Sequence, residues 1–291
     1  SDQWQYGPDQ GVRGIDGTVY AAIEWPLATA EGIRPVLIAG GTFAWAGHRA
    51  VQNLAYWDGE WRAFGIGTAG PFAAIRALCI YRGELIAAGK FTSIDGTPAN
   101  SIARWDGLSW HPLGAGIDDI VYSLCVLEDT LYVSGTFSSA GGSAANNIAS
   151  WNGEEWSALG DGLSIHNTVT PEIRALVEYE GKLFAAGTFT RSGASVISSY
   201  ASWDGSAWKQ ELPAGAVHVL RVYKDRLYAG IDSAGGTSPG IRMWNGTSWT
   251  APRGGVFQTA GYPAVYALAE YEGRLAVAGN FTQAGSLTTY S

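Results

Sequence analysis

The chain has 291 residues, of which 46% are hydrophobic, and it carries 40 glycines, 13 tryptophans and a formal net charge of −8. The acidic balance excludes nucleic acid as an expected partner, because a phosphate backbone is bound by basic surfaces. No stretch approaches the roughly 20 apolar residues of a membrane helix, so we expect no membrane insertion. Ser1 does not begin a signal peptide, and we expect the sequence to be a mature or excised part of a larger multidomain chain.

The first predicted strand contains Trp4, in the segment D-Q-W-Q-Y-G-P. It aligns with the end of a unit that recurs along the chain, such as E-E-W-S-A-L-G at residues 154–160. The complete unit is clearest from Ile102, as I-A-R-W-D-G-L-S-W-H-P-L-G. Its first tryptophan recurs at positions 57, 105, 151, 203 and 244, with spacings of 48, 46, 52 and 41. Such periods are typical of propeller blades or solenoid units.

The first copy departs from the others at two places. Ten residues, Pro26–Pro35, are inserted into its first turn. We expect this insertion to be a solvated loop or to contact another domain or subunit. In a later loop, Trp45 stands where the next two copies have serine, and His48 follows it. We select Trp45 and His48 as candidate binding residues, with packing of Trp45 over a neighbouring loop as the alternative.

Each copy predicts four short antiparallel strands, a to d. Apolar runs such as Val121–Leu127 and Leu131–Gly135 predict strands a and b, and the paired-tryptophan unit predicts strands c and d. Asp106-Gly107 and its equivalents indicate the hairpin between c and d. No period of 3.6 residues is sustained, which excludes helical solenoids.

The last copy is incomplete. Its final segment, Leu287–Ser291, aligns with the c strand before Trp203 and lacks a d strand. The strand around Trp4 therefore completes the last blade, and this pairing closes the ring without an exposed edge. We predict an all-β fold: a single six-bladed β-propeller domain over residues 1–291, with four antiparallel strands per blade.

The strand order, with L-Y-x-x-G in strand b and an aromatic residue followed about five residues later by Trp, resembles the kelch repeat of galactose-oxidase-like propellers. The resemblance covers essentially the whole chain, although the double glycine of that repeat is present only as Gly40-Gly41. The W-D-G-x-x-W-x-x-L-G variant is similar to repeats of secreted or surface-anchored propellers, which implies an extracellular or cell-surface location. WD40 repeats fit less well, because their Gly-His partner does not recur here.

The loops predict which face binds a partner. The a-b and c-d turns share one face and are short, whereas the b-c and d-a loops share the other and are long and diverse, as in Phe137–Asn147 and Gly160–Glu172. Variable loops on a rigid scaffold are a common place for recognition. We therefore expect the partner on the b-c/d-a face.

A ring of large side chains is predicted at the start of the a strands. The first position is always Val or Ile and packs, so the second position is free to line the mouth of a central channel. This ring can hold an anionic or sugar-like ligand, anchor a partner's loop, or simply fill the channel. Its members are Tyr20, Arg76, Tyr122, Arg174, His218 and Tyr266.

No catalytic, metal or cofactor site is predicted. The four histidines show no ligand spacing, no G-x-S-x-G motif is present, and Cys79 and Cys125 are interpreted as small buried hydrophobic residues. The favoured function is a non-enzymatic binding module for an unknown protein or glycan. A carbohydrate-binding lectin is the first alternative, and a hydrolase or lyase with an unrecognised site is the second.

Overall fold

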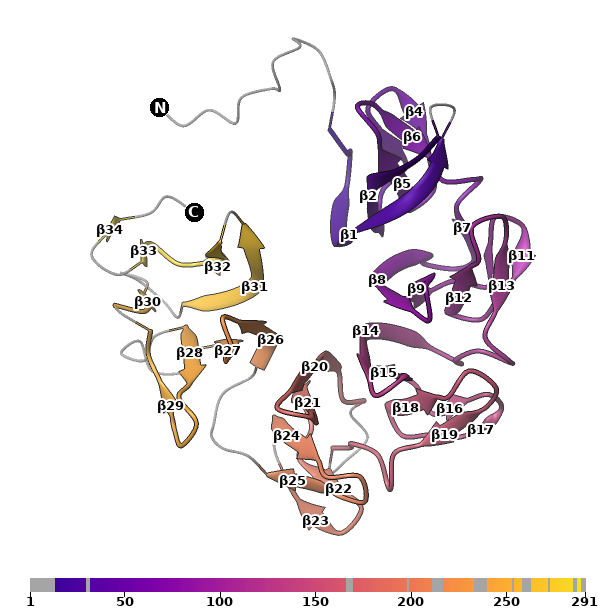
Figure 1. The fold of residues 1–291 in the computed structure, drawn as a ribbon. Coiled ribbons are helices and arrows are strands. Elements are labelled where there is room, and N and C mark those ends of the chain that lie inside the picture. Colours follow the sequence, from indigo (N-terminus) through magenta and orange to yellow (C-terminus); the bar gives the residue numbers. More distant parts are fainter. Residues whose placement is uncertain are drawn as a thin grey trace. The chain divides into compact units, whose positions relative to one another are not determined.

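The fold was analysed in a computed structural model, which contains strands, turns and loops (Figure 1). It describes residues 14–29, 32–165, 170–197, 199–210, 217–232, 240–252, 254–257, 263–271, 273–284 and 287–288. None of the described residues belongs to a helix that is long and apolar enough to cross a membrane. The predicted strand around Trp4 and its predicted partner at Tyr290 lie outside these residues.

Within the described residues, five four-stranded antiparallel sheets follow one another along the chain, each in the predicted order a-b-c-d. The first is β1 (Thr18–Thr29), β2 (Gly32–Thr42), β5 (Leu54–Trp57) and β6 (Trp61–Ala63). The second is β8 (Ala74–Tyr81), β9 (Glu84–Lys90), β12 (Ile102–Trp105) and β13 (Trp110–Pro112). The third is β14 (Ile120–Leu127), β15 (Thr130–Thr136), β18 (Ile148–Trp151) and β19 (Trp156–Ala158).

The remaining sheets continue the pattern. The fourth is β20 (Ile173–Tyr179), β21 (Lys182–Gly187), β24 (Tyr200–Trp203) and β25 (Trp208–Gln210). The fifth is β26 (Val217–Tyr223), β27 (Arg226–Ile231), β28 (Ile241–Trp244) and β29 (Trp249–Thr250). A last hairpin pairs β31 (Ala264–Tyr271) with β32 (Arg274–Asn280).

The b-c loops are more regular than we predicted, because most of them contain a small hairpin. These hairpins are β3 (Trp45–Ala46) with β4 (Arg49–Ala50), β10 (Ser93–Ile94) with β11 (Thr97–Pro98), β16 (Ser139–Ala140) with β17 (Ser143–Ala144), β22 (Arg191–Ser192) with β23 (Ser195–Val196), and β33 (Gln283–Ala284) with β34 (Leu287–Thr288). Two of them also pair with a strand from the preceding d-a loop, β7 (Thr68–Ala69) or β30 (Val256–Phe257). This backbone pairing ties consecutive loops of the b-c/d-a face together.

The chain divides into two compact units. One unit comprises the described residues within Ser1–Leu124, Phe137–Ala144 and Trp151–Ser157. The other comprises those within Cys125–Thr136, Ala145–Ser150 and Ala158–Ser291. We refer to them as the first and the second unit.

The repeated tryptophans are packing residues. In each four-stranded sheet the tryptophan of strand c lies beside that of strand d, with ring centroids 5.2 to 5.7 Å apart in T-shaped or tilted geometry. In the first unit, Phe64 also contacts Trp105 and Trp110, at 5.0 and 5.6 Å. Trp110 is almost fully buried in the core that the first two sheets share. These ring contacts make the paired tryptophans packing elements of the sheets.

The described residues of the insertion Pro26–Pro35, 26–29 and 32–35, are strand rather than solvated loop, contrary to one of the two expectations for it. Its residues extend β1 and β2, and the ladder continues through the pairs Pro26 with Pro35 and Leu27 with Arg34. Trp25 and Leu27 are buried in the first unit's core. Alternate side chains of the extension therefore pack against the core, which accounts for strand structure here.

Candidate binding site

A β-bulge stands at the predicted ring position in five a strands. The register of the a-b ladder shifts between the residues on either side of Tyr20, and the same shift occurs around Arg76, Arg174, His218 and Tyr266. A bulge inserts one unpaired residue and re-aims its side chain. The position that the sequence pattern selected is thus set apart from the ladder by the backbone itself.

A glycine on strand b accompanies the bulge. A Cβ atom built on Gly89 would lie 2.0 Å from the carbonyl oxygen of Ala74, and one on Gly187 would lie 2.0 Å from that of Glu172. Real side chains do not approach a carbonyl oxygen so closely. The glycine that ends L-Y-x-x-G therefore allows strand b to pass close to the start of strand a. The fifth sheet differs, because Ile231 is the residue that pairs with the start of its a strand.

The residue before each ring position packs inward. Ile75, Val121, Ile173 and Val265 have no exposed surface, whereas Val19 is 43% exposed. The ring residues themselves are half-buried or exposed, up to 56% for Tyr266. An inner and an outer position thus alternate at the start of these strands.

In the first unit, the structure brings three ring residues together. The guanidinium carbon of Arg76 lies 4.7 Å from the ring centroid of Tyr20 and 5.1 Å from that of Tyr122. Both distances are in the range of cation–π contacts. The Nε atom of Arg76 is buried and has no hydrogen-bond partner among the described residues.

In the second unit, the other three ring residues also meet. Arg174 donates a hydrogen bond from Nη1 to Nδ1 of His218 at 2.8 Å, and the His218 ring lies edge-on to Tyr266 at 5.0 Å. Because a guanidinium can only donate, Nδ1 of His218 is the acceptor and Nε2 carries the proton. Nε2 lies 2.9 Å from Oδ1 of Asp232.

The carboxylate of Glu172, which stands just before strand β20, neutralises Arg174. Oε2 of Glu172 lies 2.8 Å from Nε and 2.6 Å from Nη2 of Arg174. The sequence analysis did not select Glu172 or Asp232. Glu172 could have been found, because it stands two residues before Arg174, whereas Asp232 comes from the end of another strand and leaves no local signal.

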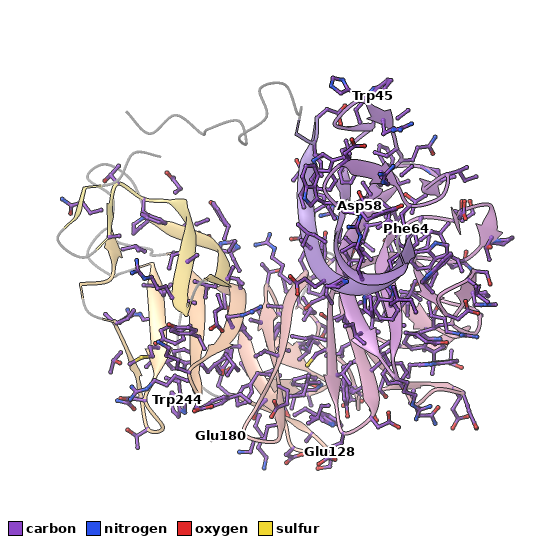
Figure 2. The ribbon with its side chains drawn as sticks, turned by 45° about the horizontal axis from the view of Figure 1, so that its top comes forward. Trp45, Asp58, Phe64, Glu128, Glu180 and Trp244 are labelled. Carbon is purple, nitrogen blue, oxygen red and sulfur yellow. The ribbon has the colours of Figure 1, made fainter. Side chains whose placement is uncertain are left out.

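Trp45 and His48, selected from the sequence, line one hollow of about 460 Å³ together with Gly14, Ile15, Asp16 and Gly47. Trp45 also borders a second hollow of about 440 Å³, whose other lining residues are Ala44, Ala50, Val51, Gln52, Gly65 and Ile66. The Trp45 side chain is 50% exposed. Figure 2 shows it at the tip of the first unit, away from Asp58 and Phe64. Trp45 therefore borders two open hollows, and its role as a binding residue stays a prediction.

Asp16 holds the hairpin that carries Trp45. Its Oδ1 accepts hydrogen bonds from the backbone N–H groups of Ala44, at 3.0 Å, and Trp45, at 2.8 Å. Asp118 binds the N–H groups of Ser138 and Ser139 in the same way. The recurrence of Gly-Ile-Asp at residues 14–16 and 116–118 is a signal for this support that the sequence analysis missed.

Two more apolar side chains are exposed in the d-a loop of the first unit. Ile66 is 68% exposed and Phe72 is 94% exposed. Phe72 also has a φ of 57°, a conformation that is unusual for a bulky residue. A large ring is thus presented to solvent by a strained backbone, on the same loop face as Trp45.

A third hollow lies in the second unit, at the end where the a-b and c-d turns are found. It has a volume of about 170 Å³ and is lined by Tyr179, Glu180, Lys182, Phe184, Tyr200, Trp244, Gly246 and Trp249. Figure 2 shows Glu180 and Trp244 at this end of the unit. Aromatic walls with an acidic and a basic side chain at the rim suit a polar, ring-shaped ligand.

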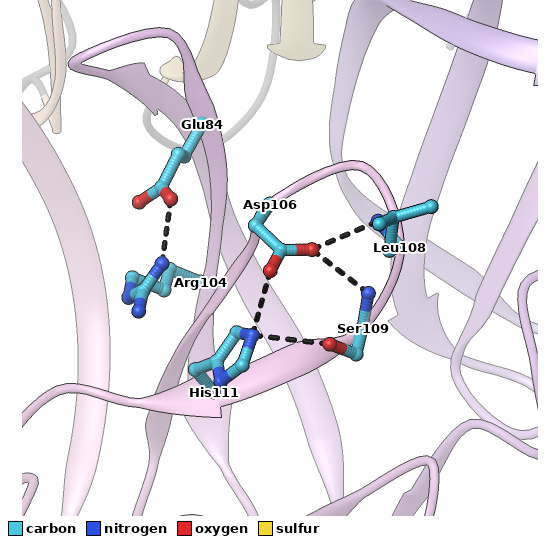
Figure 3. A network of polar contacts seen from close by, with 6 residues as sticks. All are labelled: Glu84, Arg104, Asp106, Leu108, Ser109 and His111. Atoms are coloured by element: carbon cyan, nitrogen blue, oxygen red, sulfur yellow. Dashed lines mark hydrogen bonds and ion pairs between the residues drawn. The ribbon is translucent and has the colours of Figure 1, made fainter.

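The described residues also contain a serine, a histidine and an aspartate in contact, at the c-d turn of the second sheet (Figure 3). Nε2 of His111 lies 3.0 Å from Oγ of Ser109 and 2.8 Å from Oδ2 of Asp106. A catalytic triad needs the two partners on different ring nitrogens. Oδ1 of Asp106 accepts the N–H groups of Leu108 and Ser109, so this cluster shapes the turn.

Cys79 and Cys125 are half-buried, and within the described residues they form no disulfide. Burial raises the pKa of Cys125 to about 12, so its thiolate is scarcely populated at neutral pH. Within the described residues, no group of three His, Cys, Asp or Glu side chains is placed to hold a metal ion.

Comparison with known proteins identifies the fold. Residues 83–105, from β9 to β12, match the family described as "Domain of unknown function (DUF5122) beta-propeller". The chain is a β-propeller. The WD40 β-propeller domain of Doa1 is 11% identical to it, with a TM-score of 0.50 over 93% of this chain and 92% of that one. A chain of the mitotic checkpoint complex is 13% identical, with a TM-score of 0.51 over 90% of this chain and 72% of that one.

No protein with a curated description matches this propeller. Identities of 11 and 13% show the fold alone, so they carry no activity or partner over to this chain. The predicted all-β propeller with four-stranded antiparallel sheets is confirmed. The number of six blades and the closure by the N-terminal strand stay predictions.

Proposed function

We propose that this propeller is a non-enzymatic interaction module whose protein partner binds the b-c/d-a loop face. The observation that carries the proposal is the exposure of Trp45, Ile66 and Phe72 on that face of the first unit. Exposed aromatic and aliphatic side chains beside open hollows are typical of interaction surfaces. Because Asp16 holds the backbone at Trp45, little conformational entropy is lost when a partner binds.

The proposal includes a closed ring of six kelch-type blades. Five four-stranded sheets and the β31–β32 hairpin account for six a-b hairpins among the described residues. Closure by the strand around Trp4 would complete the last blade and remove its exposed edge. The b-strand glycines and the paired tryptophans support the resemblance to kelch repeats.

We further propose that the module acts outside the cell or at its surface. The support is the W-D-G-x-x-W-x-x-L-G repeat, which is similar to repeats of secreted and surface-anchored propellers. A rigid, apolar loop face at the cell surface suits a partner that presents a matching apolar patch.

Site-specific photo-crosslinking on intact cells tests the face and the location together. A photoreactive phenylalanine analogue replaces Trp45, Ile66 or Phe72 in the full chain. Matched controls carry it at Leu108 or Ile33, which are 88% and 78% exposed at the opposite, short-turn end of the first unit's sheets. We expect a discrete protein adduct from the first three positions and none from the controls. Equal adducts from both sets, or none from any position, would overturn the proposal.

A carbohydrate-binding lectin is the second candidate, and the hollow beside Trp249 favours it. Its volume of about 170 Å³ fits one sugar ring, and Trp244 and Trp249 are repeat tryptophans. In the second sheet the equivalent place is occupied, because Arg82 lies against Gly153 there. A glycan array with the whole chain, repeated for Trp249→Ala, distinguishes the two functions: a saccharide that depends on Trp249 supports the lectin.

A further inference from the structure

Arg76 differs from other arginines of the first unit in what surrounds its charge. Arg62 lies 2.7 Å from Asp58, and Arg104 lies 2.5 Å from Glu84. Arg76 instead contacts the rings of Tyr20 and Tyr122, and none of the described carboxylates is within ion-pair distance of it. Asp119, which stands just before the strand of Tyr122, is paired with Lys90.

The two tyrosines determine which part of Arg76 remains available. Cation–π contacts use the face of the planar guanidinium, whereas hydrogen bonds to an acceptor are made along its edge. The buried Nε atom lacks an acceptor among the described residues, and a buried donor without a partner is costly. Tyr20 is 44% exposed, so the site is open to solvent on its side.

We propose that Arg76, Tyr20 and Tyr122 form a binding site for a carboxylate. The Nε–H and Nη–H groups of Arg76 donate two parallel hydrogen bonds to the carboxylate oxygens, and the two rings hold the guanidinium in place. A monoanion is favoured over a doubly charged phosphate, because the chain carries a net charge of −8. This site is independent of the proposed loop-face partner, since it uses none of Trp45, Ile66 and Phe72.

The fourth sheet contains a natural precedent for this binding. Arg174 occupies the same bulge position as Arg76, and Glu172 places a carboxylate oxygen on its Nε and Nη2 atoms. Ala74 is the residue that stands two positions before Arg76, and it offers no such group. The proposed ligand therefore occupies at Arg76 the Nε and Nη edge that one oxygen of Glu172 occupies at Arg174.

Sodium acetate is the probe for the experiment, with sodium chloride at equal ionic strength as the reference. Binding to the full chain is followed by calorimetry and by the NMR signals of the Arg76 Nε–H group and the Tyr20 ring. We expect saturable shifts of both signals with acetate and none with chloride. Arg76→Gln removes the response of Tyr20, and Arg76→Lys weakens acetate binding about tenfold, because the planar fork is lost.

Two further variants separate a binding site from a structural effect. Arg104→Gln, which removes an arginine already paired with Glu84, leaves acetate affinity unchanged. Glu172→Ala creates a second responding arginine at Arg174. An unchanged Tyr20 response in a folded Arg76→Gln variant, or the same shifts with chloride, would overturn the proposal. A peptide with a single glutamate is then compared with acetate. If the peptide binds more tightly, the carboxylate of the natural ligand is an acidic side chain of a protein. If the two affinities are equal, the natural ligand is a free carboxylic acid.

Discussion

Arg76 and Arg174 stand at the same point of two sheets, and their surroundings are opposite. Each is the bulged residue of its a strand, and each follows an isoleucine with no exposed surface. Arg174 is held by Glu172 and His218, whereas Arg76 is held by two tyrosine rings. The same β-bulge therefore presents an arginine in both sheets. The neighbouring side chains determine whether its charge is neutralised, as at Arg174, or available to a ligand, as at Arg76.

The comparison shows how a repeat protein separates scaffold from site. The bulge recurs in five a strands, and a glycine faces it in most of them, so these blades aim one side chain out of the ladder at the same place. The chemistry at that place is then free to differ between blades, because the ladder does not use the bulged residue. Function in this propeller is expected to follow differences between blades at equivalent positions.

The largest effect is expected from the shared scaffold. Gly89→Ala and Gly187→Ala each place a Cβ atom 2.0 Å from a carbonyl oxygen, so the start of the a strand must move. We expect each variant to lose about 3 kcal/mol of unfolding free energy, as strongly overpacked sites do. Chemical denaturation of the two variants measures this loss.

Gly14→Ala is the control, because a Cβ atom there meets nothing within 4 Å. Its unfolding free energy should stay within about 0.5 kcal/mol of the wild type. Stability of Gly89→Ala equal to that of the control would show that the bulge can shift freely, and the equivalence of the two arginines would then lose its basis.

A smaller effect distinguishes the two arginines themselves. Arg174→Met leaves Glu172 and Nδ1 of His218 without their donor, and we expect a loss of about 1 kcal/mol, since the Arg174–Glu172 pair is about one-third exposed. Arg76→Met removes a partly desolvated charge along with its ring contacts, so its effect should stay within about 0.5 kcal/mol. Thermal and denaturant unfolding of the pair of variants measure the difference. Equal losses would mean that Arg76 is as well satisfied as Arg174.

The sequence predicted the elements of this comparison better than their contacts. Val121–Leu127 was predicted as a strand and β14 covers Ile120–Leu127, because apolar runs and turn residues are local signals. The six ring positions followed from the same alternation. The bulge did not, since a register shift depends on how strand a pairs with strand b and leaves no residue type of its own.

Side-chain partners were the hardest part to predict. Asp232 meets His218 only because the end of β27 returns beside the start of β26, and Tyr20 meets Arg76 across two sheets. Such contacts depend on three-dimensional packing that one sequence does not encode locally. The support of Trp45 by Asp16 was readable, because Gly-Ile-Asp recurs, yet its meaning needed the hydrogen bonds.

The smallest expected effect extends the comparison to the outer turns. Asp106 in the second sheet and Asn245 in the fifth accept the same two backbone N–H groups of their turns, but only Asp106 titrates. Hydrogen bonds from Ser109 and Leu108, and then from His111, lower the pKa of Asp106 from 3.8 to about 2. A lowered pKa means that the ionised turn stabilises the fold above pH 4, and that this contribution is lost as the pH falls toward 2.

Asp106→Asn should therefore be slightly less stable than the wild type at pH 7, because it lacks the charge, and should lose less stability than the wild type between pH 4 and pH 2. The asparagine keeps the acceptor oxygen that Asn245 uses and removes the titrating group. Asp106→Ala, which removes both, is the matched variant and should be less stable than either at pH 7. Melting temperatures of the three proteins at pH 7, 4 and 2.5 test this order. If the melting temperature of Asp106→Asn fell as steeply with pH as that of the wild type, the titrating group would be another residue. The turns of Asp106 and Asn245 would then be equivalent, whereas Arg76 and Arg174 are not.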